Sequence, residues 1–292
     1  MFEEAQYFAP VSQTVGGVVV ELAQSDPGFG DPVYRARRND IAALTLGHAR
    51  EQPVPVVEYT ALEDALWAHV SKELSPKHQK YAVEEFLQGT ERLGLPAHRI
   101  PQLQEVSEAL EPLTGFRYLP AAGLVPLREF YEVLADGYFH STQYIRHISM
   151  PFYTPEPDVI HEVIGHANML ASDRFARLYR LAGEAARRVQ TQSALEFISK
   201  IFWFTLEFGV MKESGELRAY GAGILSSCGE IEKFRTMHIR PLDLRAMGTF
   251  QYDITKYQEL LFCADSVEHL ENVVGTFWAE CDDDSIARLE AA

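Results

Sequence analysis

The chain has 292 residues, of which 47% are hydrophobic and 23% are charged, the composition of an ordinary globular protein. A formal net charge of −16 disfavours a general affinity for nucleic acid or for an anionic membrane. The three cysteines, Cys228, Cys263 and Cys281, form no CxxC pair, which fits a reducing cytoplasm better than a disulfide framework. We expect no secretory leader and no membrane span, because charged residues interrupt the most apolar stretch.

The first half of the chain divides into an arm and a helical region. Residues 1–55 are rich in Gly, Pro and Asp, and they predict an irregular arm that crosses a surface. From Val57 onward the apolar residues have helical spacing, as in residues 58–74. Ser75–Pro76 predicts the start of the next helix, which ends near Gly94. Shorter helices are expected in residues 102–113 and 126–137.

The second half is also predicted to be mainly helical. Residues 173–189 predict a helix with Asp173 at its N-cap, and residues 193–212 predict a long, central, apolar helix. A last helix, with a break, is expected within residues 246–280. The best strand signals are short and lie at residues 146–150 and 216–223. The sum is a mainly α (α+β) single domain of residues 1–292 with a small β-sheet.

The stretch His161-Glu162-Val163-Ile164-Gly165-His166 resembles the zinc-protease motif H-E-x-x-H, but one extra residue separates the histidines. On a straight α-helix two residues five apart point about 140° from each other. Gly165 permits a bend or a π-type bulge that would turn the two rings together. Pro155 and Pro157 hold the entry extended, so Asp158 is the expected N-cap. The spacing therefore neither excludes nor proves a shared metal.

Glu207 is the candidate for a third ligand. Its neighbours on a helix are apolar, and a carboxylate there is costly unless it is neutralised, paired or bound to metal. Two histidines and one carboxylate are the facial triad of non-haem Fe(II) oxygenases, whereas zinc with Glu162 as general base is the competing chemistry. Two unremarkable alternatives stay open: structural histidines, and a Glu207 that pairs with Lys200.

Three ordered strings of sequence surround these residues. They are "STQYIRHISMPFYTPEPDVIHEVIGH", "FWFTLEFGV" and "AYGAGILSSCGE". Together they resemble the catalytic domain of the pterin-dependent aromatic amino acid hydroxylases, most clearly from Gly123 to Glu230. The resemblance implies a helical, basket-like fold in which His161, His166 and Glu207 hold one Fe(II). It also implies a tetrahydropterin cofactor and O2 as co-substrate. Neither a regulatory domain nor a tetramerisation tail is evident, so we expect a monomer.

The resemblance also assigns residues to the cofactor and to the substrate. The pterin is expected to contact Gly123, Leu124, Val125, Phe130, His140 and Glu162. Arg146 is the expected clamp for the α-carboxylate of the amino acid, since a guanidinium binds a carboxylate with two hydrogen bonds. Thr154 and Ser226 would lie near the amino acid head group and a ligand histidine. The aromatic pocket is expected to be walled by Pro157, Trp203, Phe208 and Gly223.

Substrate choice depends on few positions. Trp203 resembles the members that act on phenylalanine or tyrosine, and Ile254 would leave a phenol hydroxyl without a partner. The prediction is therefore a phenylalanine 4-monooxygenase that forms tyrosine. The alternatives are attack at the meta position, L-tryptophan as substrate, a zinc hydrolase, or a non-catalytic amino-acid-binding protein.

Overall fold

The computed structural model describes residues 9–251 and 258–291. In the following lists, η2, η3 and η5 are π-helical and η4 is a 3-10 helix. The helices are α1 (Pro32–Thr45), α2 (Ala61–Tyr81), α3 (Glu84–Leu93), α4 (Leu103–Thr114), α5 (Leu127–Leu134), η2 (His161–Ala167), α6 (Asn168–Leu170), α7 (Asp173–Arg188), α8 (Gln192–Phe202), η3 (Trp203–Glu207), α9 (Ala222–Leu225), α10 (Glu230–Lys233), η4 (Phe234–Thr236), α11 (Leu244–Thr249), α12 (Val267–Leu270), η5 (Glu271–Gly275), α13 (Thr276–Glu280) and α14 (Asp283–Ala291). The strands are β1 (Val11–Thr14), β2 (Gly17–Val20), β3 (Arg117–Ala121), β4 (Tyr138–Thr142), β5 (Val210–Glu213), β6 (Glu216–Ala219), β7 (His238–Pro241) and β8 (Leu260–Ala264).

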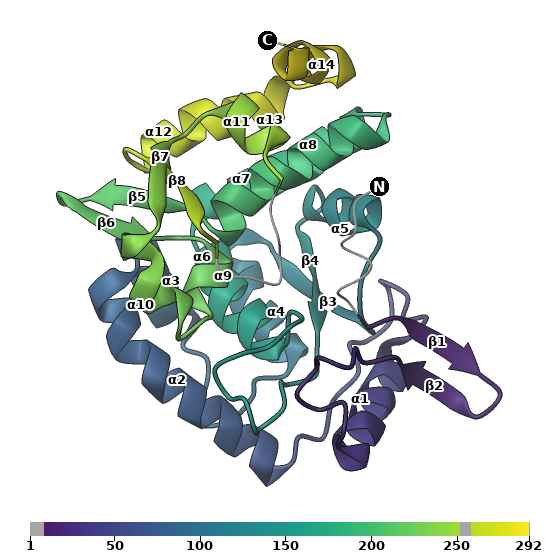
Figure 1. The fold of residues 1–292 in the computed structure, drawn as a ribbon. Helices are drawn as coiled ribbons and strands as arrows, with labels where there is room; N and C mark the ends of the chain where they lie inside the picture. The colour runs from purple at the N-terminus through teal and green to yellow at the C-terminus, as the bar shows by residue number, and fades with distance from the viewer. Residues whose placement is uncertain (1–8, 252–257, 292) are drawn as a thin grey trace.

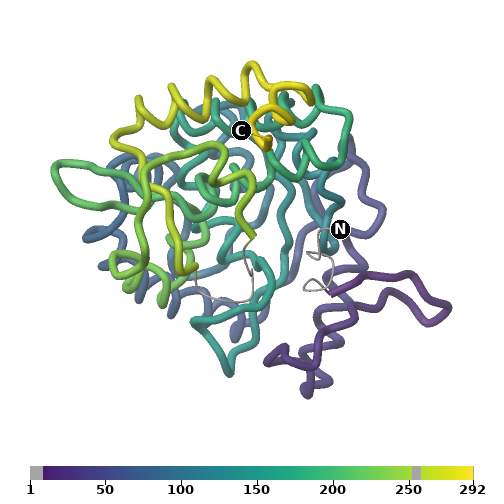
Figure 2. The backbone as a smooth tube through the Cα atoms, turned by 45° about the horizontal axis from the view of Figure 1, so that its top comes forward, coloured from purple at the N-terminus to yellow at the C-terminus, as the bar shows by residue number. Residues whose placement is uncertain are grey.

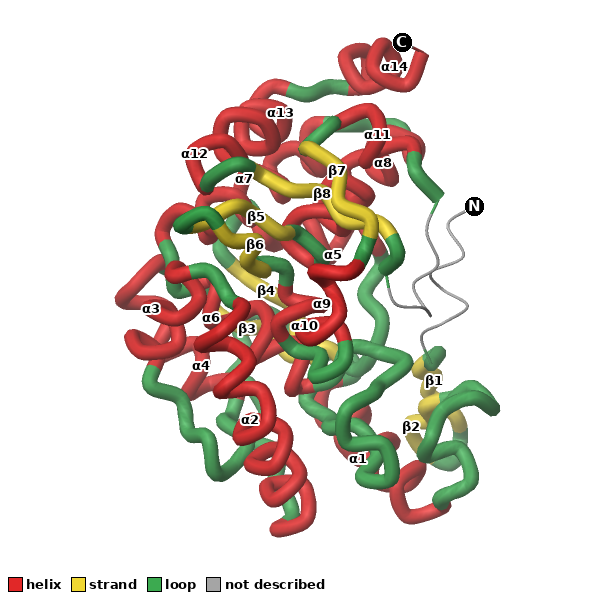
Figure 3. Tube along the Cα trace, turned by 60° about the vertical axis from the view of Figure 1, so that its left-hand side comes forward, coloured by secondary structure: helices red, strands yellow, loops and turns green. Residues whose placement is uncertain are grey.

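The strands form three small sheets within a mainly helical molecule, as the sequence predicts (Figure 1). β1 and β2 make an antiparallel hairpin, β3 and β4 pair in parallel, and four strands form a sheet in the order β6-β5-β8-β7. In this sheet β8 is parallel to both of its neighbours, and all five of its residues are buried. Figure 3 shows this sheet with α12 and α13 on one side and α9 and α10 on the other.

The helix expected from Ser75–Pro76 to near Gly94 is divided between two elements: its first residues continue α2, and α3 ends at Gly94 as expected. α2 runs without a break for 21 residues and keeps Pro76 inside it. The helix begins at Thr60, which forms a capping box with Glu63. The buried face continues in register across the proline, so packing offsets the hydrogen bond that Pro76 cannot donate. The buried residues of this face are Leu66, Trp67, Val70, Leu74 and His78.

The prediction of an irregular arm for residues 1–55 is wrong for the part of this segment that the structure describes. The hairpin β1–β2 and the 14-residue helix α1 occupy much of it, at the side of the molecule away from the C-terminal helices (Figure 2). Asp31 caps α1 by accepting hydrogen bonds from the amides of Val33 and Tyr34, and Pro32 occupies the first turn. The sequence has this signal, but the surrounding glycines obscure it.

Four further expectations differ from the structure. Residues 146–150 are a loop and not a strand, and only residues 216–219 of the second candidate are a strand. The helix predicted to reach residue 212 ends at Glu207, and β5 follows it. β8 occupies a segment that was expected to be helical, because Leu260–Ala264 pairs with β5 and β7 at the centre of the sheet. A short apolar run does not distinguish a buried strand from a buried helix.

A large hydrophobic core extends from Leu66 in α2 to Ile286 in α14. It contains the apolar faces of α7 and α8 and surrounds the π-helical segment η2. Within the described ranges, none of the helices combines the length and the apolar character that crossing a membrane requires.

Candidate metal centre

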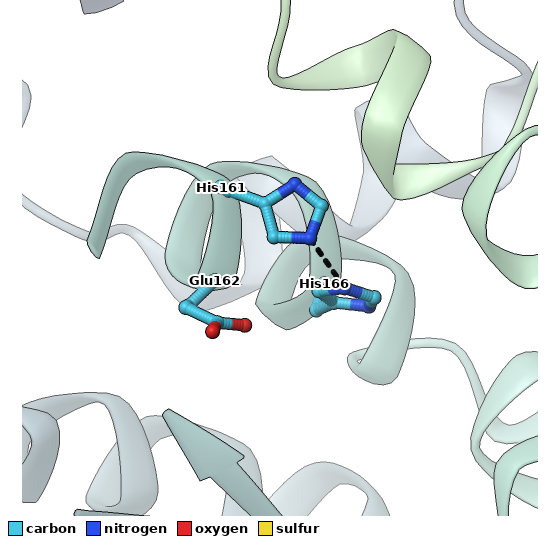
Figure 4. Close-up of side chains that lie close together, drawn as sticks. All are labelled: His161, Glu162 and His166. Atoms are coloured by element: carbon cyan, nitrogen blue, oxygen red, sulfur yellow. Dashed lines mark hydrogen bonds between the residues drawn. The ribbon is translucent and has the colours of Figure 1, made fainter. Parts of the chain in front are cut away.

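The two histidines of the His161–His166 motif are brought together by the π-helix η2. In a π-helix each amide bonds to the carbonyl five residues earlier, so side chains five apart stand one above the other. The Nε2 atoms of His161 and His166 are accordingly only 3.1 Å apart (Figure 4). The departure from a straight α-helix, expected from the spacing and from Gly165, is confirmed.

Gly165 has a second role, in packing. A Cβ atom at this position would lie 2.8 Å from the carbonyl oxygen of Ala222, so only glycine lets α9 approach η2 so closely. The start of the helix is also as expected, because Asp158 accepts a hydrogen bond from the amide of His161 at 3.2 Å.

Glu207 reaches the histidine pair from the π-helix η3. Its carboxylate oxygens lie 3.1 Å from Nε2 of His166 and 3.5 Å from Nε2 of His161. Neighbouring ligands of one six-coordinate ion, with bonds of about 2.1 Å, lie about 3.0 Å apart. The three separations therefore fit a single metal ion between these side chains, with ligand positions left open for other molecules.

Glu162 is a second carboxylate beside the histidines. Ligand atoms of His161, Glu162 and His166 all lie within 4.8 Å of one another, and Figure 4 shows the three side chains together. Burial and the nearby charges of Glu207 and Asp158 raise the pKa of Glu162 well above its usual value. Burial also acts to raise the pKa of Glu207, but the two histidines outweigh it and lower that pKa. Glu207, whose oxygens approach both histidine Nε2 atoms, is the carboxylate placed to bind a cation together with them, and Glu162 lies beside this group.

Each histidine is oriented through its other ring nitrogen. Nδ1 of His161 lies 3.0 Å from Oγ of Ser226, whose hydroxyl donates to the carbonyl of Ala222 at 2.8 Å. Nδ1 of His166 lies 2.7 Å from the hydroxyl of Tyr179. If Nδ1 donates in both pairs, both Nε2 lone pairs face the metal position. Burial lowers the pKa of His161 to about 4, which keeps its ring neutral and able to bind metal at pH 7.

The histidines and Glu207 line a cavity of about 1180 Å³. This volume exceeds that of most single-ligand pockets, so there is room for two small molecules. All six residues expected to contact the pterin line it: Gly123, Leu124, Val125, Phe130, His140 and Glu162. Both ring nitrogens of His140 are buried without a hydrogen-bond partner in the described part of the chain. A polar heterocycle in this part of the cavity would supply the missing partners.

Seven of the eight residues expected to contact the amino acid also line the cavity. They are Arg146, Thr154, Pro157, Trp203, Phe208, Gly223 and Ser226. Ile254, the eighth, lies outside the described residues. The rings of Trp203 and Phe208 are 4.6 Å apart, and a Cβ atom on Gly223 would lie 2.5 Å from the Phe208 ring. Gly223 therefore leaves the space that this aromatic wall needs.

Arg146 is more constrained than the sequence indicates. Its Nε and one terminal nitrogen donate to the two carboxylate oxygens of Asp158 at 2.8 and 2.7 Å. Both side chains are almost fully buried. Sequence reasoning identified Asp158 only as a helix cap and missed this pair. Asp158 fixes the guanidinium at the cavity wall, which limits the directions in which Arg146 can bind a carboxylate.

Two other residues of the site were missed. Tyr179 lies on α7 and carries no sequence signal beyond a buried position on a helix. Glu230 lies at the start of α10 and lines the cavity, although it is only 6% exposed. It stands at the end of the string "AYGAGILSSCGE", where the charge among apolar and small residues was its only signal.

Comparisons with known proteins agree with this geometry. Residues 7–288 match the family model of the biopterin-dependent aromatic amino acid hydroxylases. The chain belongs to this family. Its family is biopterin-dependent, its mainly helical fold with small sheets is that of the family's catalytic domain, and the grouping of His161, His166 and Glu207 fits one iron ion.

Individual relatives cover the chain to different extents. The chain is 52% identical, over 89% of its length, to a phenylalanine 3-hydroxylase of Streptomyces coeruleorubidus, and it covers 93% of that protein. It is 40% identical to the phenylalanine-4-hydroxylase of Rattus norvegicus but spans only 58% of that protein's length. The structure of Chromobacterium violaceum phenylalanine hydroxylase with bound iron(III) and 7,8-dihydrobiopterin is similar, with a TM-score of 0.75 and 29% identity. That match covers 83% of this chain and 89% of the other.

Proposed function

We propose that this protein hydroxylates the aromatic ring of L-phenylalanine, using O2 with Fe(II) and a tetrahydropterin. The observation that carries the proposal is the grouping of His161, His166 and Glu207 within 3.1–3.5 Å in a cavity walled by Trp203 and Phe208. Relatives named phenylalanine hydroxylases support the same substrate. A zinc hydrolase is disfavoured, since the five-residue spacing of the two histidines departs from the H-E-x-x-H motif of zinc proteases.

The protein's part in the reaction is to bind and to orient. His161, His166 and Glu207 would hold the iron, while Ser226 and Tyr179 keep the two rings in the metal-binding tautomer. The bound iron and reduced pterin together supply the activation of O2. Glu162 and His140 would hydrogen-bond the polar edge of the pterin, and Phe130 would stack on its ring.

The substrate would lie between a polar and an aromatic wall. Arg146, fixed by Asp158, would bind the α-carboxylate, with Thr154 close by. Pro157, Trp203, Phe208 and Gly223 would wall the pocket for the phenyl ring in the same cavity as the metal-binding residues. Which ring carbon faces the iron depends on small shifts, and a misplacement of about 1 Å changes rates about 10²-fold.

We propose the 3-position as the site of attack, giving meta-tyrosine. The support is the relative named phenylalanine 3-hydroxylase, which is 52% identical and matches over 93% of its own length. The 4-position, expected from the sequence, is the second candidate. It is supported by the relatives named phenylalanine-4-hydroxylases at about 40% identity.

One assay tests the reaction and the position together. The purified protein is supplied with Fe(II), a synthetic tetrahydropterin, O2 and L-phenylalanine, and the tyrosine isomers are separated by chromatography. We expect meta-tyrosine that requires O2 and pterin. Para-tyrosine as the main product would establish the second candidate, and no tyrosine of any kind would refute the hydroxylase. Parallel incubations with L-tryptophan and L-tyrosine test the substrate preference.

We further propose that the protein works in the cytoplasm as a monomer. All three cysteines are buried and free, which is usual for a protein of a reducing compartment. Light scattering on the purified protein tests the monomer, and a dimer mass at micromolar concentration would contradict it.

A further inference from the structure

Glu230 is a buried acid of the cavity that the proposed reaction does not yet use. It is 6% exposed and lies in α10, just after the segment that carries Ser226 and Ser227. Its amide is anchored by the Ser227 hydroxyl at 3.2 Å. The carboxylate accepts one long hydrogen bond, 3.4 Å from the amide of Gln258. An ionised carboxylate has room for about four hydrogen bonds, so among the described residues most of its capacity is unused.

The other acids that line the cavity have different surroundings. Glu162 and Glu207 lie at the metal position, and Glu156 is paired with Arg38 at 2.9 Å. Glu196 is half-buried and Glu259 is exposed. Of the described residues, Lys233 acts electrostatically on Glu230 but no cation forms an ion pair with it. Glu230 is thus a buried acid of the cavity lining that forms no ion pair within residues 9–251 and 258–291.

Gln258 places Glu230 close to the aromatic wall. The indole nitrogen of Trp203 donates to the side-chain oxygen of Gln258 at 3.1 Å. The backbone amide of Gln258 in turn donates to the carboxylate of Glu230. The cavity therefore carries two fixed groups of opposite sign, the Arg146 guanidinium and the Glu230 carboxylate, beside the pocket for a ring. An α-amino acid carries a carboxylate and an ammonium on one carbon next to its ring, so its two charges are complementary in sign to these two groups.

We propose that Glu230 supplies the counter-charge for the α-ammonium group of the substrate and so makes the site selective for amino acids over acids that lack the amine. This inference rests on the proposed function and assigns a partner to the half of the substrate that Arg146 does not bind. A buried carboxylate without a partner is costly, and a bound ammonium would relieve that cost. The empty protein bears the cost, and binding of the correct substrate recovers it.

The test compares two ligands that differ only at the α-substituent. L-Phenylalanine carries an ammonium there, and L-3-phenyllactate carries a hydroxyl. Their dissociation constants are measured by calorimetry on the iron-loaded protein, for the parent, for Glu230→Gln and for Glu232→Gln. Glu232 is the matched control, since it lies on the same short helix with its side chain exposed and pointing to Lys77. Thermal unfolding of each variant reports whether it is folded.

We expect Glu230→Gln to weaken L-phenylalanine binding about tenfold to hundredfold, the value of one hydrogen bond between charged groups. Phenyllactate binding should change less than twofold, and Glu232→Gln should change neither. If Glu230→Gln weakens the binding of both ligands equally, Glu230 has a structural role only and the inference is overturned. Unchanged L-phenylalanine binding would overturn it as well. If Glu230→Gln does not fold, the parent decides: a parent that binds phenyllactate as tightly as phenylalanine contradicts the inference.

Failure of the proposed function has a different signature. A parent protein that forms no tyrosine isomer and binds no L-phenylalanine refutes the hydroxylase and this inference with it. A parent that forms tyrosine, together with a Glu230→Gln variant that does not separate the two ligands, refutes the inference alone.

Discussion

Removal of the Tyr179 hydroxyl should weaken metal binding while leaving the fold intact. The hydroxyl lies 2.7 Å from Nδ1 of His166, and the tyrosine ring is fully buried. In the metal-free Tyr179→Phe protein, the ring proton of His166 can move from Nδ1 to Nε2. From there it can be donated to the Glu207 carboxylate, 3.1 Å away. In the metal-bound protein Nε2 must keep its lone pair, so the Nδ1 proton is left buried and unpaired.

The magnitude follows from that unpaired group. A buried donor without an acceptor costs about 1–3 kcal/mol. Since each 1.4 kcal/mol is a factor of ten, metal affinity should fall about tenfold to hundredfold. The same range is typical for the loss of a hydrogen-bond partner of a metal-binding histidine. The phenyl ring is kept, so the unfolding free energy of the metal-free protein should change by less than about 1.5 kcal/mol.

The assay is an anaerobic titration with Fe(II) in the presence of a competing chelator. Tyr220→Phe is the matched control, because Tyr220 is also fully buried but its hydroxyl has no hydrogen-bond partner among the described residues. We expect Tyr220→Phe to bind iron like the parent. A Tyr179→Phe protein with parental iron affinity, or equal losses in both variants, would refute the reasoning.

Two further predictions concern the elements around the metal. Gly165→Ala places a methyl group 2.8 Å from the Ala222 carbonyl oxygen, so α9 must move. Overpacking of this kind should lower the free energy of unfolding in denaturant by about 1–3 kcal/mol. Iron affinity should also fall, because Ser226 moves with α9. A Gly165→Ala protein with parental stability and iron affinity would contradict this account. Asp158→Asn leaves Arg146 buried without its anion and should cost about 3–5 kcal/mol at pH 7. Although burial acts to raise it, the pKa of Asp158 is lowered by Arg146, so its contribution exists above the usual pKa and is lost as the pH falls below about 4. The stability difference between parent and Asp158→Asn should therefore shrink in acid, and a constant difference from pH 7 to pH 3 would disagree with the pairing.

A pH dependence of opposite sign is expected for Glu230 in the ligand-free protein. Burial raises its pKa to about 7 and outweighs the lowering by Gln258 and Lys233. The folded state therefore binds a proton that the unfolded state has released, and the parent loses stability as the pH rises from about 4.5 to 7. Glu230→Gln lacks this loss, so it should be more stable than the parent at pH 8 and similar to it at pH 4.5. Parallel stability curves for the two proteins would exclude an unpaired Glu230.

The local geometry of the metal helix was predictable because it depends on residues near one another in the chain. The five-residue spacing and Gly165 left a bend or a π-type bulge open, and η2 adopts the π-type turn; Asp158 caps its start as expected. Glu207 was identifiable because a carboxylate among large apolar residues needs a compensating partner. The strings around these residues then indicated the family and the expected contact residues, and all of those contact residues that lie in the described part of the chain line the cavity.

The remainder depended on contacts between distant segments. Pro76 continues α2 because its buried face packs in register, which local propensity does not reveal. β8 is a strand because it has neighbours on both sides. The Arg146–Asp158 pair and the Tyr179–His166 contact each join residues from different elements, and no periodic pattern encodes them.

The central claim is that Glu207, and not Glu162, completes the iron site with His161 and His166. Iron content and tyrosine formation should be measured together on Glu207→Ala and Glu162→Gln proteins after anaerobic loading with Fe(II). We predict that Glu207→Ala retains no iron and forms no tyrosine, while Glu162→Gln retains iron at the parental level with altered pterin binding. A Glu207→Ala protein with parental iron content and turnover, or a Glu162→Gln protein without iron, would contradict the account.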